Sequence, residues 1–192
     1  MKGQKKADPR QRILEVADRL FYTDGVRATG TEKIMSIAEV AKATFYRHFE
    51  SKDALVLAYL GNRDQALWDY LAYPAPPKDI REALAKFEQL ANRPEVTSCP
   101  FLRIASEYPD TAHPFHRLAV EHQNKILDYL VELLKPCAIN RRAVAAAILS
   151  VINGSLTTRM LYGTLKEAPL LSSAEAILKK FFRTRDLNAP DD

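Results

Sequence analysis

The chain of 192 residues is 47% hydrophobic and 27% charged, which is typical of a soluble globular protein that can bury a core without disulfides or metal ions. No apolar run approaches the roughly 18 residues of a membrane span, and the basic N-terminus leads into an amphipathic segment, so we expect a cytoplasmic protein, neither embedded in a membrane nor secreted. Residues 1–52 carry all of the net charge of +4, with 11 Lys and Arg against 7 Asp and Glu, as expected of a nucleic-acid-binding head or of a solvated basic surface.

The first fifty residues contain three predicted helices. Asp8 and Pro9 supply an N-cap and a first helical residue, and an apolar stripe at the helical period then continues until the chain meets Gly25. A short helix follows, reaching residue 38, with Thr31 as its expected N-cap. A second short helix covers residues 41–49.

Longer helices separated by proline make up the rest of the chain. Ser51 is the expected N-cap of a helix that reaches about Tyr73, and the run Pro74-Ala75-Pro76-Pro77 then forms a stiff corner. The helical period returns over residues 79–93, 100–108, 113–135, 141–162 and 173–185. With no strand pattern between them, the sequence predicts an all-α fold of about nine helices.

The two short helices, joined by a tight turn and braced by the first helix, have the layout of a helix-turn-helix. Successive helical residues lie about 100° apart, so Phe45 and Phe49 share one face and Tyr46 points away from it. We expect the two phenylalanines to be core residues. Tyr46 would lie outside, beside Arg47 and His48, where a hydroxyl and cations suit a phosphate; a half-exposed tyrosine lying across its neighbours is the alternative.

The residues that begin two of these helices are suited to contacts with a duplex. Lys42, Ala43 and Thr44 stand at the leading end of the second short helix, where helix-turn-helix proteins meet base edges. Lys52 opens the long helix, whose N-terminal amides and dipole favour a phosphate.

The ordered run VAKATFYRHFESKDAL, from Val40 to Leu55, lies within a longer stretch, Arg10 to Leu60, that resembles the DNA-binding domain of the TetR-type repressors. The resemblance implies phosphate contacts by Thr31, Tyr46, His48 and Lys52 and base contacts by Lys42, Ala43 and Thr44. Three residues depart from the family pattern: Glu39 replaces a turn glycine, Ala41 a Ser-type cap and Asn153 a frequent Asp. At Glu39 either the turn is adjusted or some backbone strain is tolerated.

We expect a helix-turn-helix DNA-binding domain over residues 1–52 and a helical regulatory and dimerisation domain over residues 53–192. The segment 141–162 is rich in small apolar residues, and the resemblance implies that it forms a four-helix homodimer interface with 173–185. A core helix within one chain is the alternative.

Aromatic walls with a few polar groups in the middle helices suit a small-molecule cavity, although aromatics at helical spacing are as readily core. The expected ligand-binding residues are Trp68, Phe87, Phe101, Arg103, Glu107, Phe115 and Asn153. We expect no cofactor and no metal. Cys99 and Cys137 lie far apart in the sequence and belong to no CxxC pair, so neither a disulfide framework nor a zinc site is indicated.

Together these patterns predict a ligand-responsive transcriptional regulator, a repressor by preference, that binds a palindromic DNA operator as a homodimer and is released by a small-molecule effector. We do not expect an enzyme, because no nucleophile motif or glycine-rich phosphate loop is present. The alternatives are an all-helical enzyme or metal-binding protein using Glu107, His113 and His116, and a structural DNA-coating protein without an effector.

Overall fold

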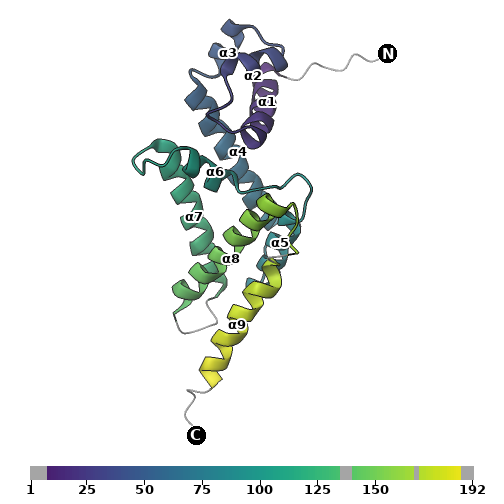
Figure 1. The fold of residues 1–192 in the computed structure, drawn as a ribbon, viewed down its shortest axis with the longest axis vertical. Helices are drawn as coiled ribbons and strands as arrows, with labels where there is room; N and C mark the ends of the chain where they lie inside the picture. Colours follow the sequence, from purple (N-terminus) through teal and green to yellow (C-terminus); the bar gives the residue numbers. More distant parts are fainter. Residues whose placement is uncertain (1–7, 135–139, 167–168, 187–192) are drawn as a thin grey trace, which may run out of the picture. The chain divides into compact units, whose positions relative to one another are not determined.

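The computed structural model describes residues 8–134, 140–166 and 169–186, with the backbone alone described for 182–186. These residues form nine α-helices and no strand, which confirms the all-α fold (Figure 1). The helices are α1 Pro9–Thr23, α2 Thr31–Ile37, α3 Lys42–His48, α4 Lys52–Ala72, α5 Ile80–Ala91, α6 Pro100–Glu107, α7 Pro114–Leu133, α8 Arg141–Tyr162 and α9 Leu170–Asp186.

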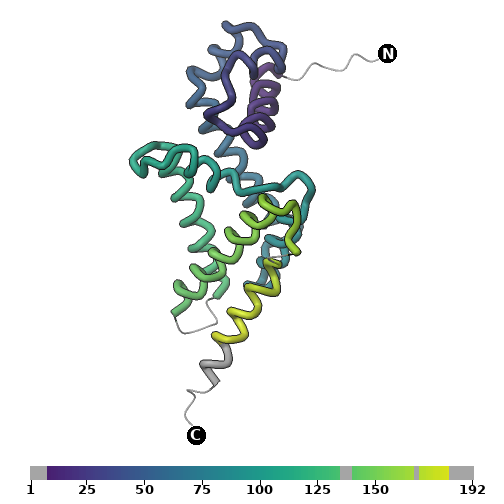
Figure 2. The backbone as a smooth tube through the Cα atoms, viewed as in Figure 1, coloured from purple at the N-terminus to yellow at the C-terminus, as the bar shows by residue number. Residues whose placement is uncertain are grey.

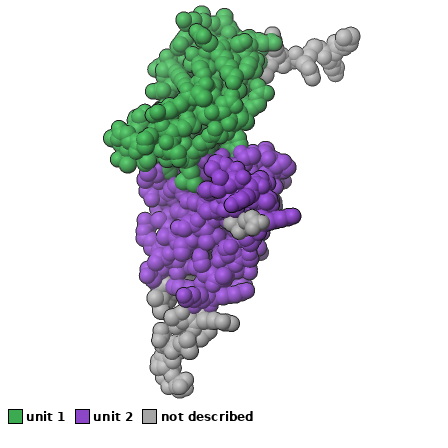
Figure 3. All heavy atoms as spheres, in the orientation of Figure 1, with its two compact units in different colours: residues 1–67, 100–119 green, residues 68–99, 120–192 purple. Residues whose placement is uncertain are grey.

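The chain divides into two compact units, coloured separately in Figure 3. Unit 1 consists of residues 1–67 and 100–119, and unit 2 consists of residues 68–99 and 120–192. Two helices, α4 and α7, therefore begin in unit 1 and end in unit 2. The domain boundary predicted at residue 52 marks the end of the helix-turn-helix motif. The two compact units are divided elsewhere and on a different criterion, so this boundary stays a prediction.

The core of unit 1 is built on the apolar stripe of α1, against which α2 and α3 pack (Figure 2). Ile13 of α1, Ile34 of α2 and Phe45 of α3 are all completely buried. Phe21 of α1 meets Tyr59 of α4 edge to face, with ring centroids 5.5 Å apart. Helices as short as α2 and α3 are unstable alone, so this packing, worth about 1.5–3 kcal/mol for each large side chain, is what holds them.

One of the caps predicted from the sequence was wrong, and another has the predicted position but no side-chain bond. Ser51 does cap α4, because the Ala54 N–H donates to its Oγ at 3.0 Å. Asp8 stands before α1, but its side chain makes no capping hydrogen bond; its backbone carbonyl instead accepts the Arg12 N–H at 3.0 Å. Thr31 is the first residue of α2, because Gly30 is the extended N-cap residue and its carbonyl accepts the Ile34 N–H.

In unit 2, α5 and α8 both pack against α9, as the tube in Figure 2 shows. The buried positions of α9, Leu170, Ala174 and Leu178, recur every four residues and so lie on one face. On α8 one face is likewise buried, through residues that include Ile148 and Ile152, while the opposite face stays exposed.

Candidate nucleic-acid interface

The short helix α3 is fixed by its aromatic residues and presents a polar outer face. Phe45 and Phe49 are 0% and 4% exposed, which confirms that they are core residues, and the Arg10 guanidinium lies 5.3 Å from the centre of the Phe49 ring. Tyr46 is 42% exposed although its ring touches that of Phe45, with centroids 5.2 Å apart. The core side of α3 is therefore apolar, and a tyrosine is available on the other side.

The eight residues predicted to contact DNA all belong to unit 1, where they come from the starts of α2 and α4 and from α3. Five lie on α3 beside Tyr46: Lys42, Ala43 and Arg47 are exposed, and Thr44 and His48 are half-buried. Thr31 and Lys52, the first residues of α2 and α4, are half-buried too. Their contacts with DNA stay predictions.

His48 differs from its neighbours in one respect. Its Nε2 atom is buried and has no hydrogen-bond partner among the described residues. In this rotamer Nε2 cannot reach a phosphate, so a His48 contact with DNA would have to use another ring atom or a rotated side chain.

The turn between α2 and α3 keeps the left-handed backbone for which the family pattern has glycine. Glu39 has φ +52°, and its N–H still donates to the Ser36 carbonyl at 3.3 Å. The Val40 N–H donates to the Met35 carbonyl at 3.1 Å. Of the two possibilities that the sequence leaves at this position, tolerated strain is therefore the one observed.

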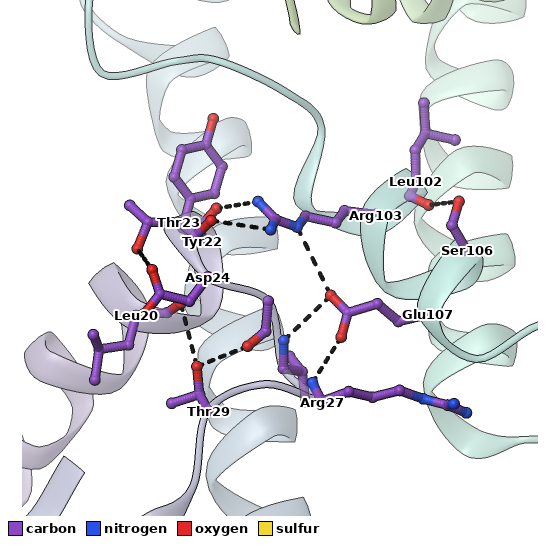
Figure 4. A network of polar contacts seen from close by, with 12 residues as sticks. Leu20, Tyr22, Thr23, Asp24, Arg27, Thr29, Leu102, Arg103, Ser106 and Glu107 are labelled. Atoms are coloured by element: carbon purple, nitrogen blue, oxygen red, sulfur yellow. Dashed lines mark hydrogen bonds and ion pairs between the residues drawn. The ribbon is translucent and has the colours of Figure 1, made fainter. Parts of the chain in front are cut away.

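The turn between α1 and α2 is held by two side chains of α6, in contacts that lie wholly within unit 1 (Figure 4). Arg103 donates to the carbonyl oxygens of Tyr22 and Thr23, at 2.6 and 3.0 Å. Glu107 accepts the backbone N–H groups of Val26 at 3.2 Å and Arg27 at 2.7 Å. These two residues, predicted from the sequence to bind a ligand, thus have their polar atoms directed at backbone.

The same turn is tied to α2. The Lys33 ammonium group donates to the Asp24 carboxylate at 2.8 Å, and this bond, helped by the Thr23 hydroxyl, lowers the pKa of the Asp24 carboxyl below its ordinary value. Thr29 is fully buried and donates to the Gly25 carbonyl at 2.7 Å. Most of this network could not be predicted from the sequence, because, apart from the side-chain bonds to Asp24, its bonds end on backbone atoms that no side-chain pattern reveals.

The seven residues predicted to bind a ligand do not all belong to one unit. Phe101, Arg103, Glu107 and Phe115 belong to unit 1, whereas Trp68, Phe87 and Asn153 belong to unit 2. In unit 1, Phe115 is buried against Tyr108 and His113, with ring centroids 5.0 and 4.8 Å away. Phe101 and Phe87 are also buried, as core residues are.

In unit 2 the remaining two predicted residues lie in polar and aromatic surroundings. The Asn153 amide donates to Gln123 Oε1 at 2.9 Å, and the Gln123 amide lies 4.0 Å from the sulfur of Cys99. Trp68 meets Tyr129 edge to face at 5.5 Å, and burial raises the pKa of the Tyr129 phenol. Gln123 was missed from the sequence, where a glutamine on a helix carries no distinctive signal, and ligand binding by Trp68 and Asn153 stays a prediction.

The alternative of a metal site or enzyme at Glu107, His113 and His116 is not supported. No group of three metal-ligating side chains occurs in the described part of the chain. The Nδ1 atom of His113 is 3.2 Å from the backbone nitrogen of Phe115, and Nδ1 of His116 is 2.9 Å from the Tyr108 carbonyl oxygen, so one nitrogen of each ring is engaged by the backbone. Cys137 lies outside the described residues.

The exposed face of α8 is apolar or small over most of its length, with the charged Arg142 exposed near its start. Ala143, Ala146, Ser150, Gly154 and Thr157 are exposed at spacings of three and four residues. A Cβ added to Gly154 would meet no atom within 4 Å. Leu161 continues this face, Met160 and Tyr162 lie to either side of it, and all three have more than half of their surface exposed.

By its length and its mean hydropathy of 1.4, α8 could also cross a membrane. Its most apolar stretch is 28% buried within the chain. One such helix is weak evidence for a membrane span. Small and apolar side chains left uncovered by their own chain on one helix face are suited to an interface with another protein.

Comparison with known proteins places these features in one family. Residues 13–59 match the model of bacterial regulatory proteins of the tetR family. A TetR-family transcriptional regulator from Streptomyces coelicolor is 30% identical, with a TM-score of 0.83, over 93% of this chain and 97% of that one. The transcriptional regulator YjdC of Escherichia coli is 23% identical over 79% of this chain and 83% of its own. YerO of Bacillus subtilis, a helix-turn-helix regulator, is 34% identical over 90 residues, and the match spans only 31% of that protein.

Proposed function

Because the chain belongs to the TetR family of transcriptional regulators, whose members are typically ligand-responsive repressors, we propose that it represses transcription by binding a palindromic DNA operator as a homodimer. The observation that carries this proposal is the construction of α3, with Phe45 and Phe49 buried and Lys42, Ala43, Tyr46 and Arg47 exposed. A helix held by one face and polar on the other fits the major groove, which is about 12 Å wide.

The residues of this head have separate roles. Lys42, Ala43 and Thr44 read base edges, since they begin the recognition helix. Phosphates are bound by Tyr46, Arg47 and His48 on the same helix and by Thr31 and Lys52 at the starts of its neighbours. Phosphate contacts set affinity and register, while base contacts set sequence preference.

Dimerisation uses the exposed face of α8 together with α9, and it pairs two heads to read two half-sites. A small molecule bound among the helices of the body releases the operator by favouring a conformation that does not bind DNA, a coupling of about 1–3 kcal/mol in typical cases. Trp68, Phe87 and Asn153 are the residues of unit 2 that we assign to this ligand. The protein acts in the cytoplasm.

Selection of bound DNA from random sequence, followed by titration at several salt concentrations, tests the proposal. Tyr46→Phe and Lys52→Ala should weaken binding to every sequence, and Lys52→Ala should lower the slope of log affinity against log salt by about one. Changing Thr44 to Val should instead alter the preferred bases. Lys78→Ala, which removes an exposed lysine of unit 2, is the control for charge alone. Unchanged operator affinity in the Tyr46→Phe/Lys52→Ala double variant would refute the assignment of contacts.

A further inference from the structure

We propose that Arg103 and Glu107 are positioning residues for DNA binding: by gripping the α1–α2 turn, α6 holds the helix-turn-helix in its DNA-binding conformation. The part of the chain needed for DNA binding then comprises α6 in addition to α1, α2, α3 and α4. This inference rests on the proposed function, because it assigns new residues to the same DNA-binding head. Neither residue lies in the segment that the family model matches, residues 13–59.

Arg103 completes the C-terminal end of α1. The last carbonyls of a helix have no partner within the helix, and a cation near them also meets the negative end of the helix dipole. Arg103 supplies both a partner and a charge, through its bonds of 2.6 Å to the Tyr22 carbonyl and 3.0 Å to that of Thr23. The position at which α1 ends is therefore set in part by a residue more than seventy positions away along the chain.

Glu107 fixes the next part of the turn. Its two carboxylate oxygens accept the N–H groups of Val26 and Arg27, one each, and bonds to an ionised acceptor are stronger than neutral ones. The Arg103 side chain lies 3.8 Å from the same carboxylate, and the two side chains are only 33% and 19% exposed. Gly25 permits this approach, because a Cβ at that position would lie 2.8 Å from Glu107 Oε1.

The α1–α2 turn is also connected to the helices of the helix-turn-helix. The Asp24–Lys33 ion pair and the Thr29 hydroxyl bond join its two ends to each other and to α2. Tyr108 follows α6 directly, and the Arg27 guanidinium lies over its ring, with the guanidinium carbon 4.7 Å from the ring centre. A change in the position of α6 would therefore move the start of α2, which precedes the recognition helix.

The experiment compares two pairs of variants of the full chain. Arg103→Ala is matched by Arg159→Ala, because the Arg159 guanidinium also donates to two backbone carbonyls, those of Val96 at 2.6 Å and Arg93 at 3.0 Å, in unit 2. Glu107→Ala is matched by Glu82→Ala, because in the parent chain the Glu82 carboxylate also accepts a backbone N–H, that of Lys78, at 2.9 Å. For each protein we would measure melting temperature, dimer content by sedimentation, affinity for the selected operator at several salt concentrations, and hydrogen exchange at the turn amides.

Arg103→Ala and Glu107→Ala should weaken operator binding about tenfold, within the usual range of coupling between sites. The salt slope should stay unchanged, because no phosphate contact is lost. The amides of Val26 and Arg27 should exchange faster in Glu107→Ala. Glu107→Gln, which keeps one acceptor oxygen and the shape of the side chain, should recover part of both effects, and the variants at Arg159 and Glu82 should bind DNA like the parent.

Three results would overturn the inference. Equal loss of operator affinity in Arg103→Ala and Arg159→Ala at equal loss of melting temperature would show a role in stability alone. A salt slope lowered by about one in Arg103→Ala would show a direct phosphate contact. Operator binding equal to that of the parent in both α6 variants would show no role at all, whereas a parent chain that selects no DNA would instead refute the proposed function.

Discussion

Glu39 holds a left-handed backbone conformation that a side chain with a Cβ atom adopts at a cost. Its φ of +52° lies at the turn between the two helices of the helix-turn-helix, where the angle between them is set. The cost of such a conformation is roughly 1–2 kcal/mol for a residue other than glycine. The chain therefore forms this turn because the packing of α2 and α3 on α1 outweighs the strain.

Replacing Glu39 with glycine should raise the free energy of unfolding by about 1 kcal/mol, because glycine adopts positive φ without steric cost. Urea denaturation measures the change. Glu39→Gln removes the charge but keeps the Cβ atom, so it should leave stability close to that of the parent, while both variants should bind DNA more tightly through the loss of a negative charge. A glycine variant less stable than the glutamine variant would show that Glu39 is not strained.

Gly25 is the second residue at which backbone and surroundings act together. It has φ +95°, and its missing Cβ leaves room for the Glu107 carboxylate. Gly25→Ala should lower the free energy of unfolding by about 1–3 kcal/mol, as is usual for a residue forced into a rare backbone region. Gly30→Ala is the control, because a Cβ there meets no atom within 4 Å.

Gly25→Ala should lower stability less in a Glu107→Ala background than in the parent, because the contact with the carboxylate is then absent and only the backbone strain remains. Thermal unfolding of the parent, the two single variants and the double variant separates the steric contribution from the strain. Equal stability of Gly25→Ala and Gly30→Ala would contradict both the close contact and the strain.

At the scale of helices, the two N-caps predicted from the sequence for α1 and α4 differ in what they contribute. Ser51→Ala should lower the free energy of unfolding by about 1 kcal/mol, because the Ala54 N–H loses its partner. Asp8→Ala should cost clearly less, since the Asp8 side chain makes no capping bond. Denaturation without DNA measures both, and an equal or larger loss in Asp8→Ala would mean that its carboxylate caps α1 in solution.

The helices themselves were predictable because proline and glycine mark their ends. Arg141–Tyr162 has the predicted bounds, and α6 and α7 are each within two residues of the prediction. The start of α9 was placed three residues too late, at Ser173 in place of Leu170, because Ser173 resembles an N-cap while the helix begins directly after Pro169. The sequence pattern thus predicts which segments are helical. It predicts the end of a helix only where one cap residue or one proline is present and no second candidate lies nearby.

The roles of Arg103 and Glu107 could not be predicted in the same way. An arginine and a glutamate four residues apart on a helix are an ordinary pair for a polar surface or a cavity wall. Their partners are backbone atoms of Tyr22, Val26 and their neighbours, which no side-chain pattern identifies. Six of the eight residues predicted to contact DNA, by contrast, stand in one short run, 42–48, whose helical geometry separates the core positions from the outer ones.

For the whole molecule, the exposed face of α8 leads to a prediction about assembly. Gly154→Leu should abolish or weaken the dimer, because a bulky side chain would separate two helices in close contact, while a leucine in place of a helical glycine should stabilise the folded chain by about 0.5–1 kcal/mol. Gly61→Leu is the matched control, since Gly61 is also an exposed helical glycine with no atom within 4 Å of its Cβ position. Sedimentation should therefore show loss of dimer in Gly154→Leu and not in Gly61→Leu; a Gly154→Leu dimer as tight as the parent would place the interface elsewhere.

The discontinuity of unit 1 has a consequence for the order of events during synthesis. Its first segment ends at residue 67, and the segment that completes it ends at residue 119, with part of unit 2 made in between. Domains fold as units while the chain emerges from the ribosome. Unit 1 therefore cannot complete its folding until residues 100–119 have been synthesised. Until then the backbone groups of the α1–α2 turn cannot form their bonds to Arg103 and Glu107.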